Sequence, residues 1–260
     1  MFSFNNLSKK KKAICKIEGG EYDGRIVYLN DKNNPEPDGE YEDFDELVLN
    51  DGKFSLTVDP SAERQILAFF GPSGSGKSYL MKKYLKEYEK LYKNNPIYMF
   101  SKKKTDISLA DVKKLKRAVI DESLVTHPMP YEFFTDSIVV FDDIDTLNQT
   151  TKAEKAIRSA VINIKDDILE LGRDRRISTL ISSHLATKGH ETKTLLNESH
   201  MIVIYPSSGA NYAYLMNKYM GLDSKQIKRI KDMDSRWVCF SRQYPNIVFS
   251  EREILAQKNL

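Results

Sequence analysis

The chain has 260 residues, of which 40% are hydrophobic, and a formal net charge of +3. This composition supports a folded core, and no apolar run is long enough to span a membrane, so we expect no membrane insertion. The N-terminal charges follow the apolar residues, unlike in a secretory signal, and Cys15 and Cys239 lack metal-site spacing, which together favour an intracellular (cytoplasmic) protein.

Residues 1–63 are expected to form a small N-terminal β appendage. Residues 46–58, ELVLNDGKFSLTV, place Asn-Asp-Gly between two alternating segments, which is the pattern of a β-hairpin. The polar stretch at residues 30–43 predicts an acidic loop. Residues 1–60 contain 13 Asp or Glu and 8 Lys or Arg, so the appendage is acidic overall.

Residues 64–260 are expected to form an α/β core. Short apolar runs at residues 65–70, 96–101, 137–143, 177–183 and 200–206 alternate with segments long enough for helices. Strands that are apolar throughout are covered on both faces, as in a parallel sheet. The clearest helix lies before Gly172, with a stripe formed by Ala153, Ile157, Ala160, Ile164, Ile168 and Leu171. A β-hairpin around Tyr244-Pro245-Asn246 is expected near the C-terminus.

A glycine-rich loop separates the first core strand from a predicted helix. The sequence GPSGSGKS has the spacing G-x-x-x-x-G-K-S of a phosphate-binding loop, or Walker A motif. The backbone N–H groups of such a loop cradle phosphates, and the positive end of the next helix assists them. We expect Lys77 to reach the β- and γ-phosphates of ATP and Ser78 to hold Mg²⁺. The residues expected to bind the nucleotide are Gly71, Pro72, Ser73, Gly74, Ser75, Gly76, Lys77, Ser78 and Tyr79.

Two carboxylates follow another apolar strand. Asp142 and Asp143 come directly after Ile138–Phe141, and in open α/β sheets ligands bind beyond the carboxyl ends of the strands. We expect Asp142 to hold the Mg²⁺ shell and Asp143 to polarise the attacking water. Asp145 is a weaker candidate. The segment ISTLISSH ends in Ser182, Ser183 and His184, and such polar residues at a strand tip can sense the γ-phosphate.

The order of these segments resembles the additional-strand (ASCE) class of P-loop ATPases. Within that class the chain resembles the FtsK–HerA superfamily, and in it the poxvirus-type genome-packaging ATPases. The resemblance rests on GPSGSGKS, VVFDD and GRDRRISTLISSHL and covers roughly residues 64–220. It implies a mostly parallel sheet flanked by helices.

The resemblance also implies roles for single residues. Arg173 falls on an arginine that precedes the third strand, and Ser183-His184 fall on a Thr-Gln pair. Asn197 falls on an asparagine of the following turn. The sequence departs from the family in having Asp143 where many members have Glu, and Met201 near the position of a second arginine. Arg173 is thus the candidate arginine finger; the alternative is that the arginines at residues 173–176 cap the preceding helix.

The function implied is ATP-driven translocation of double-stranded DNA, with packaging of a viral genome into a capsid. The catalytic residues would be Lys77, Asp143, His184 and Arg173, the cofactors ATP and Mg²⁺, and the partners duplex DNA, further copies in a homo-oligomeric ring, and capsid or portal-type proteins. A viral member would act in the host cytoplasm or a virus factory. Basic clusters at residues 101–104, 113–117 and 225–231 are typical both of nucleic-acid contacts and of a solvated lysine-rich surface.

Two other functions remain open at this point. A P-loop kinase of a small molecule uses the same loop together with an arginine-rich lid, for which GRDRR is a candidate. A nucleotide-gated assembly factor would bind ATP and turn it over negligibly. DNA-stimulated ATP hydrolysis without transfer to an acceptor distinguishes the motor from both.

Overall fold

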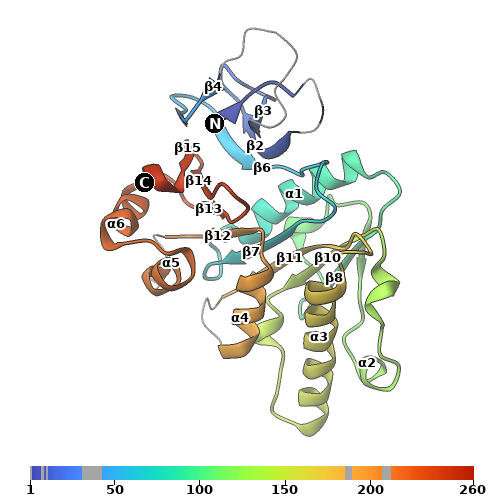
Figure 1. Cartoon of the computed structure of the whole chain (residues 1–260). Helices are drawn as coiled ribbons and strands as arrows, with labels where there is room; N and C mark the ends of the chain where they lie inside the picture. Colours follow the sequence, from blue (N-terminus) through green and yellow to red (C-terminus); the bar gives the residue numbers. More distant parts are fainter. Residues whose placement is uncertain (1, 7–8, 10, 31–42, 185–188, 207–211) are drawn as a thin grey trace. The chain divides into compact units, whose positions relative to one another are not determined.

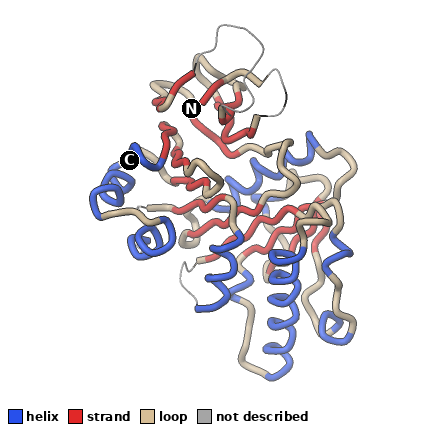
Figure 2. The backbone as a smooth tube through the Cα atoms, viewed as in Figure 1, coloured by secondary structure: helices blue, strands red, loops and turns tan. Residues whose placement is uncertain are grey.

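The computed structural model describes residues 2–6, 9, 11–30, 43–184, 189–206 and 212–260. The chain divides into two compact units, one formed by residues 63–202 and the other by residues 1–62 together with 203–260. The boundary between residues 202 and 203 falls within strand β12 (Met201–Ile204). Helices and strands of both units are distinguished in Figure 2.

The unit formed by residues 63–202 is built on a parallel sheet. Its strands, in spatial order, are β7 (Ile66–Phe70), β11 (Ser178–Ser183), β10 (Ile138–Asp142), β8 (Ile97–Ser101) and β9 (Leu115–Arg117). Strands β7 and β10 are buried along their whole length, as expected for strands covered on both faces. The prediction of an α/β fold with a mostly parallel sheet is confirmed.

The pairing register places the functional segments side by side. Strand β11 lies between the loop-bearing strand β7 and the acid-bearing strand β10. Ser182 is paired with Asp142, and Ser183 with Phe70, the residue before the glycine-rich loop. The carboxyl ends of three parallel strands therefore meet at one edge of the sheet.

Helices cover both faces of this sheet. Figure 1 shows α1 (Lys77–Leu91) on one side and α3 (Lys152–Leu171) and α4 (Gly189–Glu198) on the other. Helix α3 begins with a capping box between Thr151 and Glu154 and ends at Gly172, as predicted. Its expected stripe is partly wrong, because Leu171 is 49% exposed while Lys165 is buried. The shorter elements are helix α2 (Ser123–Thr126) and the 3₁₀ helices Ile107–Leu109, Tyr131–Phe134 and Ile144–Thr146.

The other unit contains two sets of antiparallel strands. One is ordered β4 (Asp43–Phe44), β1 (Phe2–Ser3), β3 (Ile26–Leu29), β2 (Lys12–Glu18) and β6 (Lys53–Leu56). The other is ordered β5 (Glu46–Val48), β15 (Glu253–Ala256), β14 (Ile247–Ser250) and β13 (Val238–Ser241). The remaining elements are α5 (Tyr212–Met220), α6 (Ser224–Asp232) and the 3₁₀ helix Gln257–Asn259.

Two sequence-based expectations for this unit have different outcomes. The C-terminal hairpin is confirmed, because β13 and β14 pair on either side of Tyr244-Pro245-Asn246. The hairpin at residues 46–58 is wrong: the chain turns at Gly52, but β5 pairs with β15 and β6 pairs with β2. A turn signal fixes a change of direction, whereas the strand partners depend on contacts distant in sequence. The predicted acidic loop lies largely in residues 31–42, outside the described residues.

Candidate nucleotide-hydrolysing site

The glycine-rich loop joins β7 to α1 through residues in left-handed conformations. Gly74 has φ +78° and Gly76, the residue that caps α1, has φ +104°. Side chains other than hydrogen are disfavoured at such angles, which explains the glycines at these two positions. The loop ends where the helix begins, so Lys77 and Ser78 occupy the first turn of α1. The unpaired N–H groups of that turn favour an anion.

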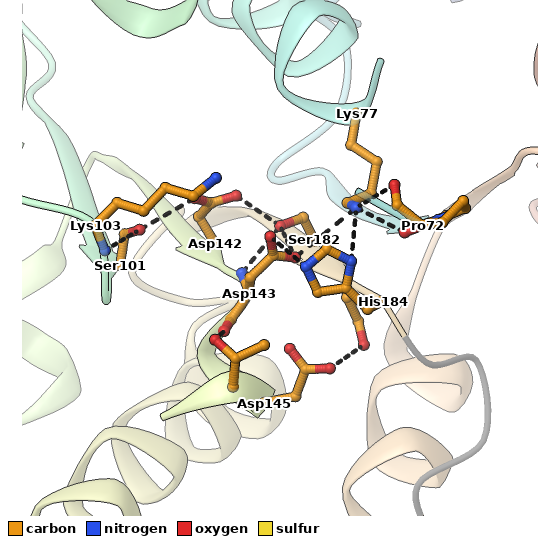
Figure 3. A network of polar contacts seen from close by, with 12 residues as sticks. Pro72, Lys77, Ser101, Lys103, Asp142, Asp143, Asp145, Ser182 and His184 are labelled. Carbon is orange, nitrogen blue, oxygen red and sulfur yellow. Dashed lines mark hydrogen bonds and ion pairs between the residues drawn. The ribbon is translucent and has the colours of Figure 1, made fainter. Parts of the chain in front are cut away.

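Lys77 is buried within this loop, with 5% of its surface exposed. Its Nζ donates hydrogen bonds to the carbonyl oxygens of Gly71, at 2.6 Å, and Pro72, at 3.2 Å. The same atom lies 4.0 Å from Asp143 Oδ1 and 3.4 Å from His184 Nδ1. Burial lowers the pKa of Lys77, while Asp143 opposes this shift. Figure 3 shows the ammonium group directed toward the acids.

Asp142 is held between the two neighbouring strands. It is the last residue of β10 and is 2% exposed. Its Oδ1 accepts a hydrogen bond of 2.7 Å from Ser182 of β11, and its Oδ2 accepts one of 3.1 Å from Ser101 of β8. Hydrogen bonds from both sides fix this carboxylate in place (Figure 3).

Asp143 is the acid that faces Lys77. Its Oδ2 lies 2.9 Å from His184 Nε2, and its Oδ1 lies 3.1 Å from the Ser182 hydroxyl, whose single proton it shares with Asp142. Burial raises the pKa of Asp143, and Lys77 opposes this shift while Asp142 adds to it. A carboxylate with a raised pKa next to a cation is the environment expected of a group that accepts a proton from, or polarises, water.

The weaker candidate, Asp145, belongs to a different contact. Its Oδ2 accepts a hydrogen bond of 3.0 Å from Ser183. The backbone carbonyl of Ser183 in turn accepts the N–H of Gly71 at 3.2 Å. Ser183 therefore connects the start of the phosphate loop to the segment after the acids, while His184 is the strand-tip residue that contacts Asp143.

Comparison with known proteins places the chain in a family. No protein-family model matches the chain. The uncharacterised protein V3 of the Sputnik virophage is 34% identical over 254 residues, which cover 96% of this chain and 98% of V3. The chain belongs to the family of V3.

Solved structures that are similar to this chain include nucleotide-binding proteins. The conjugation coupling protein TcpA of pCW3, in a structure with ATPγS, is 13% identical with a TM-score of 0.55; the match covers 93% of this chain and 77% of TcpA. B204, the DNA-packaging ATPase of Sulfolobus turreted icosahedral virus, is 16% identical with a TM-score of 0.46, covering 73% and 98%. The expected resemblance to P-loop ATPases of the FtsK–HerA type is confirmed, at the level of the fold.

From Pro72 onward, the other residues expected to bind the nucleotide are more exposed than Lys77. Ser73 and Gly74 are exposed, and Ser78 is partly buried. Tyr79 is 53% exposed, with the Lys83 ammonium 5.0 Å from the centre of its ring. This exposure leaves the outer side of the loop accessible to a ligand.

Mg²⁺ is implied by the fold, and the residues fit it. Among the described residues no group of three or more His, Cys, Asp or Glu is arranged to hold a metal alone. Mg²⁺ in nucleotide sites instead takes one or two protein oxygen ligands together with phosphates and water. The Asp142 carboxylate and the Ser78 hydroxyl offer such oxygens.

Arg173 is not brought to this site within one chain. It precedes β11, whereas Lys77 and the acids lie beyond the carboxyl end of that six-residue strand. The Arg173 side chain is 74% exposed, and its Nε donates a hydrogen bond of 2.7 Å to Glu63. The structure therefore separates Arg173 from the cluster around Lys77.

The C-terminal end of α3 is capped by an arginine that the sequence did not indicate. Arg64, 8% exposed, donates hydrogen bonds of 2.9 Å to the carbonyl oxygens of Ile168 and Leu169. The end of α3 is thus capped by Arg64, from the start of this unit, and not by the arginines at residues 173–176 that the sequence suggested as an alternative. No local signal marks Arg64, because its partners lie more than 100 residues away.

Within the described parts of the chain, no helix combines the length and apolar character needed to cross a membrane.

Proposed function

We propose that this chain is an ATP-hydrolysing motor that translocates double-stranded DNA and packages a viral genome into a capsid. The observation that carries the proposal is the meeting of Lys77 and Asp143, at 4.0 Å, beyond the ends of β7 and β10. A phosphate loop alone supports binding, whereas a loop facing a buried acid supports hydrolysis. Membership in a virophage protein family agrees with a viral role.

The proposed reaction assigns a step to each residue of the cluster. Lys77 would leave the carbonyls of its own loop and bind the β- and γ-phosphates of ATP. Asp143 would orient the attacking water and accept its proton, while His184 would hold the second oxygen of that carboxylate. Ser78 and Asp142 would hold Mg²⁺, which supplies charge neutralisation to the transferring phosphoryl group.

Assembly would complete the site. We propose a homo-oligomeric ring around duplex DNA, in which Arg173 of each subunit reaches the nucleotide of the next. The exposure of Arg173 supports this role. Arginine fingers contribute roughly 10³–10⁵ in rate where they have been measured, so that turnover would depend on assembly. Capsid or portal-type proteins would be the further partners, in the host cytoplasm, a virus factory or the virion.

Steady-state ATP hydrolysis with and without duplex DNA tests the proposal. We expect Mg²⁺-dependent turnover that DNA stimulates, and a mass in ATP that is a multiple of the monomer. Lys77→Ala should abolish turnover. The matched control is Lys90→Ala, which removes an exposed lysine of the same helix whose contact is an ion pair with Glu87.

The other outcomes identify the competing functions. Transfer of the γ-phosphate to a small acceptor, with no effect of DNA, would indicate a kinase. Tight ATP binding with negligible turnover in the presence of DNA would indicate a nucleotide-gated assembly factor. Either result would overturn the motor.

A further inference from the structure

Ser182 contacts both acids of the site. Its Oγ lies 2.7 Å from Asp142 Oδ1 and 3.1 Å from Asp143 Oδ1, and it accepts the backbone N–H of Asp143 at 3.0 Å. The side chain is 1% exposed. Among the described residues, every hydrogen bond of this hydroxyl goes to one of the two acids. A buried hydroxyl is costly unless it is hydrogen-bonded, and here its hydrogen-bond partners are the two acids.

The backbone of Asp143 has an unusual conformation, which the contact with Ser182 holds in place. Asp143 has φ +48°, in the left-handed region that residues with side chains rarely adopt. Its N–H donates to the hydroxyl of Ser182 at 3.0 Å and to the carbonyl of Ser182 at 3.2 Å. Unusual backbone conformations persist where surrounding contacts hold them, and they cluster at functional sites. Ser182 holds this one from both its side chain and its backbone.

The conformation determines where the Asp143 carboxylate points. Asp142 ends the strand and is directed to β8 and β11 through Ser101 and Ser182. The left-handed turn at the next residue sends Asp143 toward Lys77 and His184 instead. In an extended conformation, successive side chains of a strand would point to opposite faces of the sheet. Two adjacent acids therefore serve one site because of the turn.

We propose that Ser182 is a positioning residue, which aims Asp143 at the reacting water by fixing its backbone and its Oδ1. The proposal rests on the proposed ATP hydrolysis. Ser182 lies next to the Ser183-His184 pair but acts differently, since neither its hydroxyl nor its carbonyl has to contact the nucleotide.

Substitution of Ser182 tests the role in catalysis. In Ser182→Ala we expect kcat for ATP to fall on the order of 10- to 100-fold, the effect of losing hydrogen bonds to a charged group, while KM for ATP stays within about 2-fold. Ser182→Thr keeps the hydroxyl and should recover most of kcat. The matched control is Thr179→Val, which removes a buried hydroxyl of the same strand that has no hydrogen-bond partner among the described residues. This control should leave kcat unchanged.

A second measurement needs no turnover. Hydrogen exchange of the Asp143 amide, followed by NMR in the protein without added nucleotide, should be at least about tenfold faster in Ser182→Ala, because the nearer of its two acceptors is lost and only the carbonyl of residue 182 remains. The amide of Val140, within the same strand β10, should not change. If wild-type protein fails to hydrolyse ATP, the proposed function fails, and the exchange of this amide still decides whether Ser182 holds Asp143.

Three results would overturn the positioning role. One is an unchanged kcat in Ser182→Ala. Another is unchanged exchange of the Asp143 amide in that variant. The third is full recovery of kcat by added Mg²⁺, which would place the effect of Ser182 on Asp142 rather than on Asp143.

Discussion

Replacing Arg64 by Met should destabilise the unit of residues 63–202. The substitution keeps an unbranched side chain of similar length and removes the guanidinium group that binds two carbonyls of the last turn of α3. Carbonyls of a last turn generally lack partners within the helix, although that of Ile168 also accepts the N–H of Gly172. Hydrogen bonds to a charged group contribute roughly 1.5–3 kcal/mol each. Two such bonds, each of 2.9 Å, are lost.

The burial of Arg64 offsets part of this loss. Burial lowers the pKa of Arg64, which shows that the charged group is held in an environment less favourable than water, and Met removes that cost. We therefore expect the free energy of unfolding to fall by about 2–4 kcal/mol. Two charge-assisted bonds are lost, and the removed cost of burying a charge compensates only part of that loss. For a protein of this size each kcal/mol lowers Tm by roughly 2–4 °C, so a decrease of about 5–15 °C is expected.

Thermal unfolding followed by circular dichroism measures this decrease, and Arg173→Met provides the matched control. Arg173 makes an exposed ion pair with Glu63, and such pairs contribute at most about 1 kcal/mol, so its Tm should change by less than about 4 °C. If the two variants had the same Tm, the hydrogen bonds of Arg64 would not hold the end of α3, and Arg173 would regain its candidacy as the cap.

Four further predictions concern the site and the DNA. Arg173→Ala subunits should bind ATP normally and, when mixed with wild type, reduce ATPase activity more than in proportion to their share; strictly proportional loss would exclude a finger. Asp142→Asn should raise the Mg²⁺ concentration needed for half-maximal turnover, and a normal Mg²⁺ titration would contradict its role. Duplex DNA should bind without sequence preference, with an affinity that falls steeply between low and moderate salt as counterions are released; a flat salt dependence would argue against a DNA track. Asp143→Asn should bind ATP without hydrolysing it. Because burial raises the pKa of Asp143, the folded state binds that proton more tightly than the unfolded chain, so its contribution to stability decreases as pH rises from about 4 through the raised folded pKa. The nucleotide-free Asn variant should therefore have a higher Tm than wild type at pH 7 and lose this advantage near pH 3; a lower Tm at pH 7 would contradict the reasoning.

The sequence predicted the chemical parts of the site because each part is encoded locally. The loop from Gly71 to Ser78 needs glycines at left-handed positions, and the acids follow a short apolar run that is typical of a buried strand. Parallel strands bring such segments to one edge by topology. The same rule predicted that His184 lies at this edge, whereas its contact with Asp143 was found only in the structure.

The contacts that the sequence did not reveal are nonlocal. Ser101 and Ser182 come from different strands and meet Asp142 only through the pairing register. The partners of β5 and β6 were wrong because a turn motif carries no information about strands distant in sequence. The predicted apolar stripe of α3 did not include Lys165, yet Lys165 is buried, with its Nζ 2.9 Å from Asp166 Oδ1. Helical periodicity reports an average face and misses such an individual exception.

On the proposed function, a triphosphate would replace contacts that Lys77 makes within the chain. The Lys77 ammonium group donates hydrogen bonds to two loop carbonyls and lies 4.0 Å from the carboxylate of Asp143. A triphosphate that takes over the ammonium group must also separate it from Asp143, leaving this carboxylate with Ser182 and His184 as its described partners. A single exchange of partners would thus bind the nucleotide and release the acid for contact with water. Because the exchange replaces one ion pair by another, its net cost is smaller than that of exposing a buried, unpaired charge. The acid would consequently be free to act only when a phosphate is in place.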